Sequence, residues 1–219
     1  MKNLILLCFL SIFLSCSSND EKVYSKDPQI NQWAKTRVDD FQDLSYESFI
    51  QIDGEKQRAA FRALSPENKL RLWNNKADIL LKNSKNQIEK ELFTEFKSFF
   101  INFNFEKRFT KDELNFLNTL VSKGKEKLKW DEAYVVLTFG TLDIYKKDKY
   151  DYPIFSEINF ARDRAHIVDD QPTCNCKWGW CGVSSGFECK TGCENDGGSG
   201  CGFLFFQECT GACKYTGRR

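Results

Sequence analysis

Residues 174–213 read CNCKWGWCGVSSGFECKTGCENDGGSGCGFLFFQECTGAC, and this stretch decides the organisation of the chain. Residues 174–219 hold eight of the ten cysteines and ten of the thirteen glycines. Within them, residues 181–193 and 201–213 align without gaps at a period of 20, with cysteine, glycine and glutamate recurring at the same places. The sequence therefore predicts a small Cys-rich module at 174–219, built on an internal duplication and preceded by a linker at 166–173.

The cysteines of this module are even in number, which predicts four disulfides in an oxidising compartment. Each copy of the duplicated unit holds three cysteines, so we expect one bridge inside each copy and one from each copy to Cys174 or Cys176. Zinc is the alternative, but the cysteine spacing is not the usual one and no histidine assists. We therefore expect no metal and no cofactor. The expected disulfide cysteines are Cys174, Cys176, Cys181, Cys189, Cys193, Cys201, Cys209 and Cys213.

The N-terminal sequence predicts a targeting segment. Lys2 supplies a positive charge and Leu4 to Leu14 form an apolar run that is too short for a membrane helix. The run ends at Ser15-Cys16, which resembles the cleavage and lipidation site of a bacterial lipoprotein. We expect a signal peptide at 1–15, lipid on Cys16 and a polar tether at 16–26, so that the protein is anchored in the cell envelope. The outer membrane is favoured, on its periplasmic face or at the cell surface; ordinary secretion is the alternative.

Residues 27–165 predict an all-α domain of five or six helices, followed by the small disulfide-rich module. Ser65 precedes Pro66 in the arrangement of a helix cap and a first helical residue, and Thr110 with Glu113 forms a capping box. Apolar residues recur at helical spacing, and the phenylalanines among them are expected to form the core. The expected helix faces carry Ile30, Ala34, Val38 and Phe41; Leu70, Trp73, Ala77 and Leu80; and Ile88, Leu92, Phe96, Phe99 and Phe103.

The amino-acid composition argues against several classes of function. The 32 Lys and Arg residues balance 31 Asp and Glu residues, so no basic surface for nucleic acid is expected. A single histidine, the absence of a Gly-rich phosphate loop and no visible catalytic triad argue against an enzyme. The module is rich in aromatic residues. These rings either form an exposed contact patch for a partner or pack within the module; the candidate contact aromatics are Trp178, Trp180, Phe203 and Phe205.

Four sequence segments of the module and one of the helical domain carry a resemblance to a known family. The segments are CNC (174–176), WGWC (178–181), SGCGFLFF (199–206), CTGAC (209–213) and LSPENKLRLW (64–73). With the lipoprotein-like start, they resemble the bacteriocin fulvocin C-related proteins of Bacteroidota. The resemblance implies an antibacterial module carried behind a helical domain. It would act without catalysis by binding an envelope protein or receptor of a target bacterium. A non-toxic surface or periplasmic interaction or structural lipoprotein is the alternative.

Overall fold

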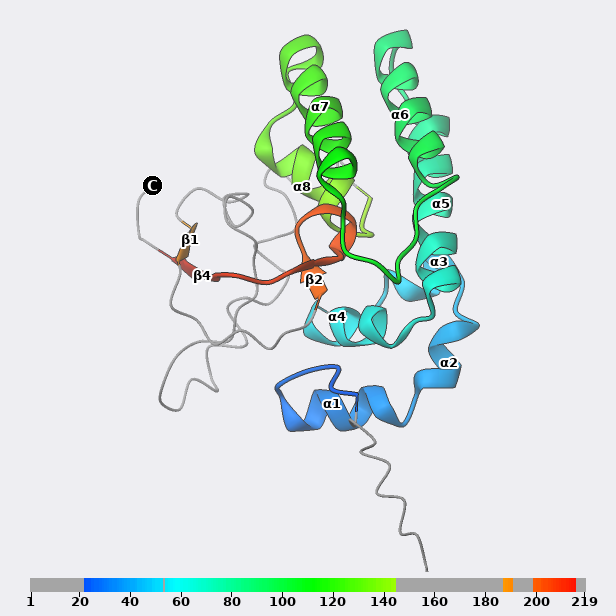
Figure 1. The fold of residues 1–219 in the computed structure, drawn as a ribbon, viewed down its shortest axis with the longest axis vertical. Coiled ribbons are helices and arrows are strands. Elements are labelled where there is room, and N and C mark those ends of the chain that lie inside the picture. The colour runs from blue at the N-terminus through cyan, green and yellow to red at the C-terminus, as the bar shows by residue number, and fades with distance from the viewer. Residues whose placement is uncertain (1–21, 53, 145–186, 191–198, 216–219) are drawn as a thin grey trace, which may run out of the picture.

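The computed structural model describes residues 22–52, 54–144, 187–190 and 199–215, and most of these are helical (Figure 1). The part of the chain that is described contains eight helices, more than the five or six expected. Their bounds are α1 Pro28–Lys35, α2 Val38–Gln42, α3 Tyr46–Phe49, α4 Gly54–Ala63, α5 Pro66–Lys82, α6 Gln87–Phe99, α7 Lys111–Leu128 and α8 Glu132–Gly140. The helical fold class expected for the middle of the chain is confirmed.

The helix starts that the sequence predicts are present. The Ser65 hydroxyl accepts a hydrogen bond from the Asn68 N–H, and Pro66 is the first residue of α5. At the start of α7, Thr110 and Glu113 form the reciprocal capping box. Both motifs satisfy backbone N–H groups that have no partner within the helix, which is why their spacing alone locates a helix start.

Two local features account for the additional helices. The helix expected through Ile30 and Phe41 is interrupted, because α1 ends at Lys35 and the backbone at Arg37 is not helical. The Thr36 hydroxyl donates to the carbonyls of Gln32 and Trp33, a local bond that competes with helix continuation. The other addition is α3, a single turn capped by Ser45, too short to produce an apolar period.

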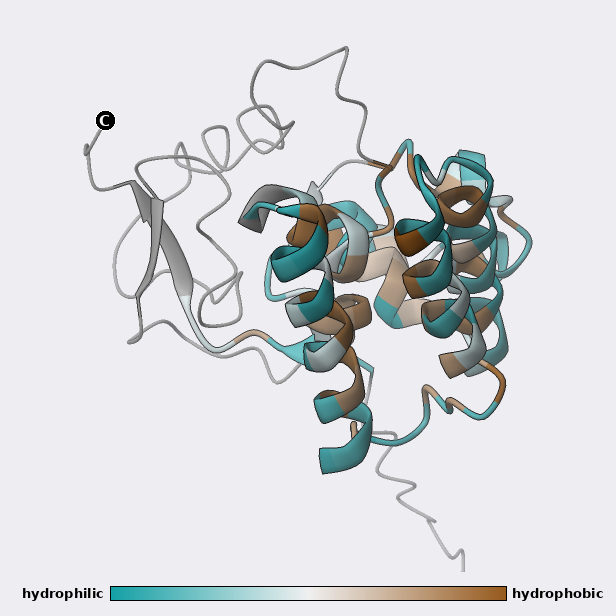
Figure 2. Ribbon diagram, turned by 90° about the horizontal axis from the view of Figure 1, so that it is seen from above, coloured by the Kyte–Doolittle hydropathy of each residue, from teal (hydrophilic) through white to brown (hydrophobic). Residues whose placement is uncertain are grey.

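The long helices α5, α6 and α7 pack side by side, and α4 with α1 lies across their ends (Figure 1). Figure 2 shows that their hydrophobic sides face one another. Trp73 of α5 is fully buried; its ring stacks on Phe100 and meets the edge of Phe96. The phenylalanines of α6 are thus core residues, as expected, although Ile88 at its start is exposed and the helix ends at Phe99 rather than reaching Phe103.

The described residues of the C-terminal module form two small antiparallel pairs. Strand β2 (Ser199–Cys201) pairs with β3 (Gln207–Glu208), and the 3₁₀ turn Phe203–Phe205 lies between them. Strand β1 (Phe187–Lys190) pairs with β4 (Ala212–Tyr215). Strand β2 lies against α4, and the turn Phe203–Phe205 lies against α8 (Figure 1). The helical domain and the end of the module are therefore in direct contact.

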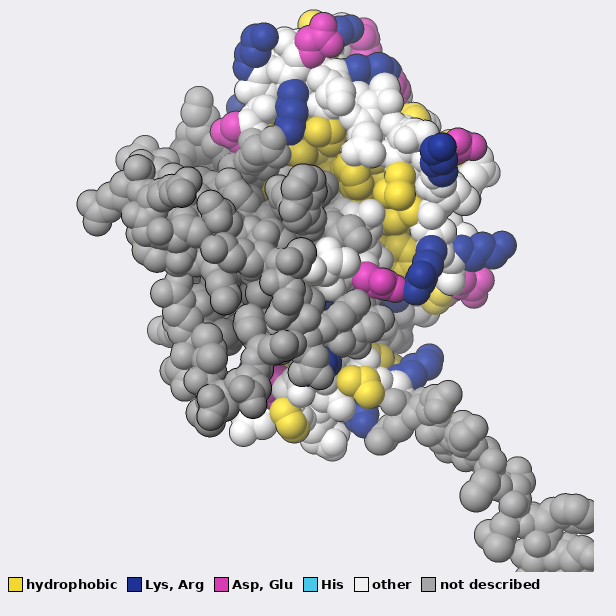
Figure 3. Space-filling model, turned by 60° about the vertical axis from the view of Figure 1, so that its left-hand side comes forward, with side chains coloured by type: hydrophobic (Ala, Val, Ile, Leu, Met, Phe, Trp, Pro, Cys, Tyr) yellow, Lys and Arg dark blue, Asp and Glu magenta, His cyan; other side chains and the backbone are white. Residues whose placement is uncertain are grey.

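A band of apolar side chains runs across the face shown in Figure 3, with charged side chains of both signs above it and along one side. Among the described residues, large apolar side chains are exposed at Val23, Ile88 and Ile101. None of the described helices combines the length and apolar character that a membrane span requires.

Candidate functional site

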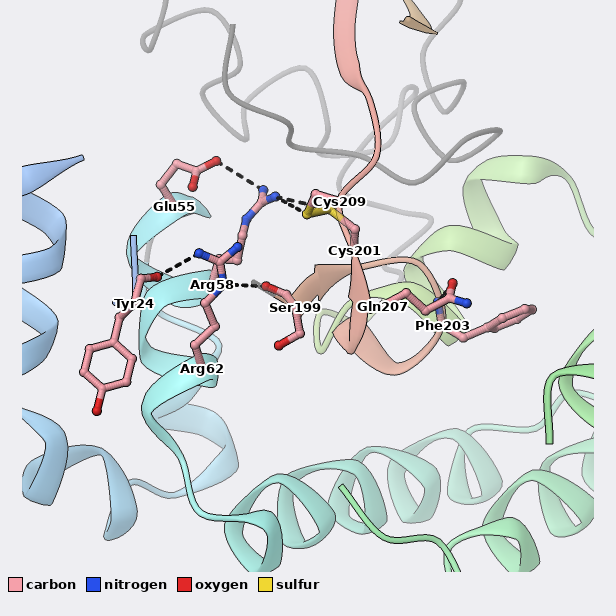
Figure 4. Close-up of a disulfide and its surroundings, with 9 residues drawn as sticks. All are labelled: Tyr24, Glu55, Arg58, Arg62, Ser199, Cys201, Phe203, Gln207 and Cys209. Carbon is pink, nitrogen blue, oxygen red and sulfur yellow. Dashed lines mark hydrogen bonds and ion pairs between the residues drawn. A yellow bond between two sulfur atoms is a disulfide. The ribbon is translucent and has the colours of Figure 1, made fainter. Parts of the chain in front are cut away.

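The candidate site is the loop of the second repeat copy, which a disulfide closes. Cys201 and Cys209 are bonded to each other, and both sulfurs lie inside the protein, with the residues 5% and 0% exposed (Figure 4). The bond lies within the copy at 201–213, where the parity of the cysteines predicts one bridge. Strands β2 and β3 lie at the two ends of the closed loop and hold it as a hairpin.

The tip of this loop is buried in the core of the helical domain. Phe203, Leu204 and Phe205 are 5%, 0% and 8% exposed and belong to the same cluster of buried residues as the helices. Phe203 and Phe205 are therefore buried against the helical domain and do not form an exposed contact patch. They form a 3₁₀ turn. Trp178 and Trp180, the other two candidate aromatics, lie outside the described residues.

Aromatic rings of the helical domain pack against the tip of the loop. The Phe205 ring lies 5.5 Å from that of Phe61 of α4, edge to face. The neighbouring Phe206 meets Phe105 at 5.0 Å and also contacts Phe103 and Phe109. Aromatic pairs in these tilted and edge-to-face arrangements contribute about 0.5–1.5 kcal/mol each beyond the burial of their area. The loop is thus fixed by several rings that come from distant parts of the sequence.

Two arginines of α4 hold the polar edge of the loop (Figure 4). The Arg58 guanidinium donates to Sγ of Cys201 at 3.4 Å and of Cys209 at 3.5 Å, and its carbon lies 5.8 Å from the centre of the Phe205 ring. Arg62 donates from Nε to the Ser199 carbonyl and from Nη1 to the Tyr24 carbonyl. Sequence reasoning missed both arginines. Their spacing of four residues places them on one face of a helix, and that was the available signal.

Arg58 is itself oriented by an acidic neighbour. Its second terminal nitrogen lies 3.2 Å from a carboxylate oxygen of Glu55, one turn earlier in α4, and its side chain is only 9% exposed. At the outer edge of the loop, Arg108 forms an exposed ion pair with Glu208 at 2.5 Å. An exposed pair of this kind contributes at most about 1 kcal/mol.

The backbone of the loop adopts a conformation that few residues tolerate. Gly200 and Gly202 have φ of 130° and 62°, and a Cβ at Gly200 would lie 2.3 Å from Cγ of Arg58. Leu204 and Phe205 also have positive φ, 55° and 54°, although neither is glycine. Left-handed backbone at such residues costs about 1–2 kcal/mol each. The ring closure and the surrounding side chains must supply this energy.

A buried lysine lies beside the loop. Lys69 of α5 is 8% exposed, and its Nζ lies 5.5 Å from the ring centre of Phe61 and 5.9 Å from that of Phe206. Burial lowers the pKa of Lys69 to about 8, and the nearby charge of Lys22 acts in the same direction. The loop therefore packs over a cation that is poorly solvated.

A second buried polar cluster lies at the end of α8. Lys76 is fully buried and donates to the carbonyls of Leu137 and Thr141. Burial lowers the pKa of Lys76 and raises that of Asp143, and the attraction between the two groups opposes both shifts. Because the ammonium group is bonded to helix-end carbonyls, we interpret this cluster as the attachment of α8 to α5.

The remaining cysteines are described only in part. The register of β1 with β4 places Cys189 opposite Cys213, so the two lie in different copies. Directly opposed residues of antiparallel strands have Cα atoms about 4.5–5.5 Å apart, within the range that a disulfide requires. Analogy with the bonded pair predicts Cys181 instead as the partner of Cys189. Peptide mapping without reduction distinguishes these two pairings.

Some of the expected site residues are not among those that the structure describes. Cys16, Cys174, Cys176, Cys181 and Cys193 lie outside the described residues. Within the described ranges, no three His, Cys, Asp or Glu side chains are grouped so that they could hold a metal ion. Comparisons of the chain with protein-family models, curated proteins and solved structures found no match.

Proposed function

We propose that this protein is an exported, lipid-anchored, bacteriocin-like protein that acts on other bacteria, without catalysis, through its Cys-rich module. The observation that carries the proposal is the Cys201–Cys209 disulfide, because such bonds form and persist in oxidising compartments. The second copy that it closes is docked in the helical core, so the helical domain supports it. From it, β4 continues the second copy and pairs with β1 of the first. A cross-linked unit on such a support suits binding at an oxidising cell surface.

The N-terminal anchor limits where such a protein acts. Tyr24 is 8% exposed within the helical core, and its N–H donates to the Asn31 side chain. Only the residues between Cys16 and Tyr24 are then left as a tether. An extended chain of this length spans at most about 30 Å. Lipid on Cys16 would therefore keep the helical domain close to the membrane surface and restrict its action to cells in contact.

A co-culture experiment tests this function. Cells that make the full chain are mixed with related strains, and survivors are counted with the two populations in contact or separated by a filter. We expect killing only in contact, and its loss with Cys16→Ala. Cys8→Ala is the matched control, because Cys8 also lies in the N-terminal segment but does not follow the expected cleavage site. Full survival of every strain together with no binding to their cells would contradict the proposal.

A second candidate function is a non-toxic interaction or structural lipoprotein. The burial of Phe203 and Phe205 favours it, because rings that are covered by the helical domain do not contact a target membrane or receptor. The same co-culture separates the two candidates. Binding to cells of another strain without loss of their viability supports the second function, whereas death of those cells supports the first.

A further inference from the structure

We infer that the helical domain is a binding domain whose ligand is a disulfide-closed peptide loop with an aromatic tip, and that it distinguishes the oxidised loop from the reduced one. In this structure the ligand is the chain's own segment, residues 199–209. The inference does not depend on the proposed action on bacteria, because it concerns recognition between two parts of this chain.

The contact has the composition of a binding interface. Its centre is apolar, where Leu204 and Phe205 are buried and Phe205 meets Phe61. Its edges are polar, with Arg62 on the Ser199 carbonyl (Figure 4) and Arg108 on Glu208. A buried aromatic centre with arginines near it is the pattern found in the strongly contributing parts of protein interfaces.

The parts that meet are distant in sequence. Arg58 and Cys201 are separated by 143 residues, and residues 141–198 connect the last helix to the loop. None of the contacts named above is a covalent link between the loop and the helices. The association should therefore persist when the connecting segment is cut.

The oxidation state of the loop is recognised at Arg58. Its Nη1 donates to both sulfurs, and this geometry requires the two sulfurs to lie side by side. Two unbonded thiols need more room than a bonded pair, and Cys201 and Cys209 are almost fully buried. Gly200 shows how little room there is, because even an added Cβ would overlap the Arg58 side chain.

The conformation of the tip also depends on ring closure. Leu204 and Phe205 have left-handed backbone, which an open chain relaxes to more favourable angles. Reduction would remove the constraint that holds these two residues in the conformation in which the Phe205 ring packs on Phe61. The helical domain should thus bind the reduced loop much more weakly than the oxidised loop.

The test uses the full chain with a specific protease site inserted between Asp169 and Asp170. After cleavage, we expect the two fragments to co-elute in size-exclusion chromatography under oxidising conditions and to separate after reduction and alkylation. Separation without a reductant would overturn the inference, as would co-elution that is unchanged by reduction.

Two variants test the Cys201–Cys209 disulfide and its contact with Arg58 separately. Cys201→Ser with Cys209→Ser removes this disulfide and leaves the other cysteines, and we expect at least about tenfold weaker association of the cut fragments. Arg58→Ala should weaken it by a similar factor. The control Arg108→Ala, at an exposed ion pair, should change it less than about threefold. Equal effects of Arg58→Ala and Arg108→Ala would contradict recognition at the disulfide.

A competition experiment on the cut wild-type protein needs no substitution, so it tests the inference even if the variants fail to fold. The probe is a synthetic peptide of residues 199–211, either closed through Cys201 and Cys209 or with serine at both positions. We expect the closed peptide to displace the C-terminal fragment at a concentration at least about tenfold lower than the open one. Failure of both peptides to displace the fragment, or equal displacement by both, would overturn the inference.

Discussion

The two copies of the 20-residue unit share their cysteine spacing but differ in the residues that the second copy buries. Between its first two cysteines the second copy has Phe203, Leu204 and Phe205, which are buried in the helical domain. The first copy has Val183, Ser184 and Ser185 at the equivalent positions. The cysteine spacing is compatible with a closed loop in both copies, whereas the residues within the loop determine whether it can pack in a core.

The position before the first cysteine differs in the same sense. Gly200 of the second copy lies against Arg58 with no space for a Cβ. The first copy has Trp180 at the equivalent position. An indole cannot occupy the space that excludes a methyl group, so the first copy cannot dock in the way that the second does. The duplication has therefore produced one loop that is suited to docking and another that is not.

The largest effect is expected when the second copy receives the first copy's residues. Phe203→Val, Leu204→Ser and Phe205→Ser together remove three buried side chains, at a cost of about 8 kcal/mol or more, which is comparable to the whole stability of a typical domain. We expect the loop to leave the core and the helical domain to unfold at a much lower urea concentration than in the wild type. Urea denaturation followed by far-ultraviolet circular dichroism measures this.

Ile101→Ser is the control for that triple variant, because Ile101 is 79% exposed. We expect it to change the free energy of unfolding by no more than about 0.5 kcal/mol. A triple variant as stable as this control would show that the loop is not part of the core.

The disulfide is expected to have the next largest effect. Cys201→Ser with Cys209→Ser should lower the free energy of unfolding by about 2–3 kcal/mol, because the bond closes a short loop in the unfolded chain. The equivalent change in the first copy, Cys181→Ser with Cys189→Ser, should alter the unfolding of the helical domain by less than about 0.5 kcal/mol. Equal losses from the two double variants would remove the distinction between the copies.

Gly200→Ala tests the close approach to Arg58. The new Cβ would overlap a side chain that is held at both sulfurs, and φ of 130° is strained for any residue with a Cβ. We expect a loss of about 2 kcal/mol in chemical denaturation. The neighbouring Ser199→Ala is the control, because Arg62 binds the carbonyl of Ser199 rather than its side chain. A neutral Gly200→Ala would mean that Arg58 can move aside.

Local features of the fold could be predicted from sequence, because their causes are local. The cap at Ser65 and the capping box at Thr110 need only neighbouring residues. The break at Arg37 and the single turn α3 were missed, since an apolar period of three or four residues does not report on either. The buried tip was missed for another reason. The change in composition at residue 174 indicates a new kind of segment, but it does not reveal which surface covers Phe205.

The smallest predicted effect concerns Lys69 and Phe206, whose counterpart in the first copy is Gly186. Because burial lowers the pKa of Lys69 to about 8, the unfolded chain binds a proton more tightly than the folded chain does. The resulting penalty is fully present below pH 8 and disappears as the pH rises toward about 10.5, the ordinary value for lysine. Stability should therefore rise by nearly 2 kcal/mol between pH 7.5 and 9.5, through this group alone.

Urea denaturation of wild type and of Lys69→Met at these two pH values isolates the contribution, since the other titrating groups, Lys76 among them, are present in both proteins. We expect a smaller rise with pH in Lys69→Met. Phe206→Gly, which gives the second copy the first copy's residue, should reduce the rise in the same way, because water would then reach the ammonium group. An unchanged rise in Phe206→Gly would mean that the helices alone bury Lys69 and that the loop does not affect its pKa.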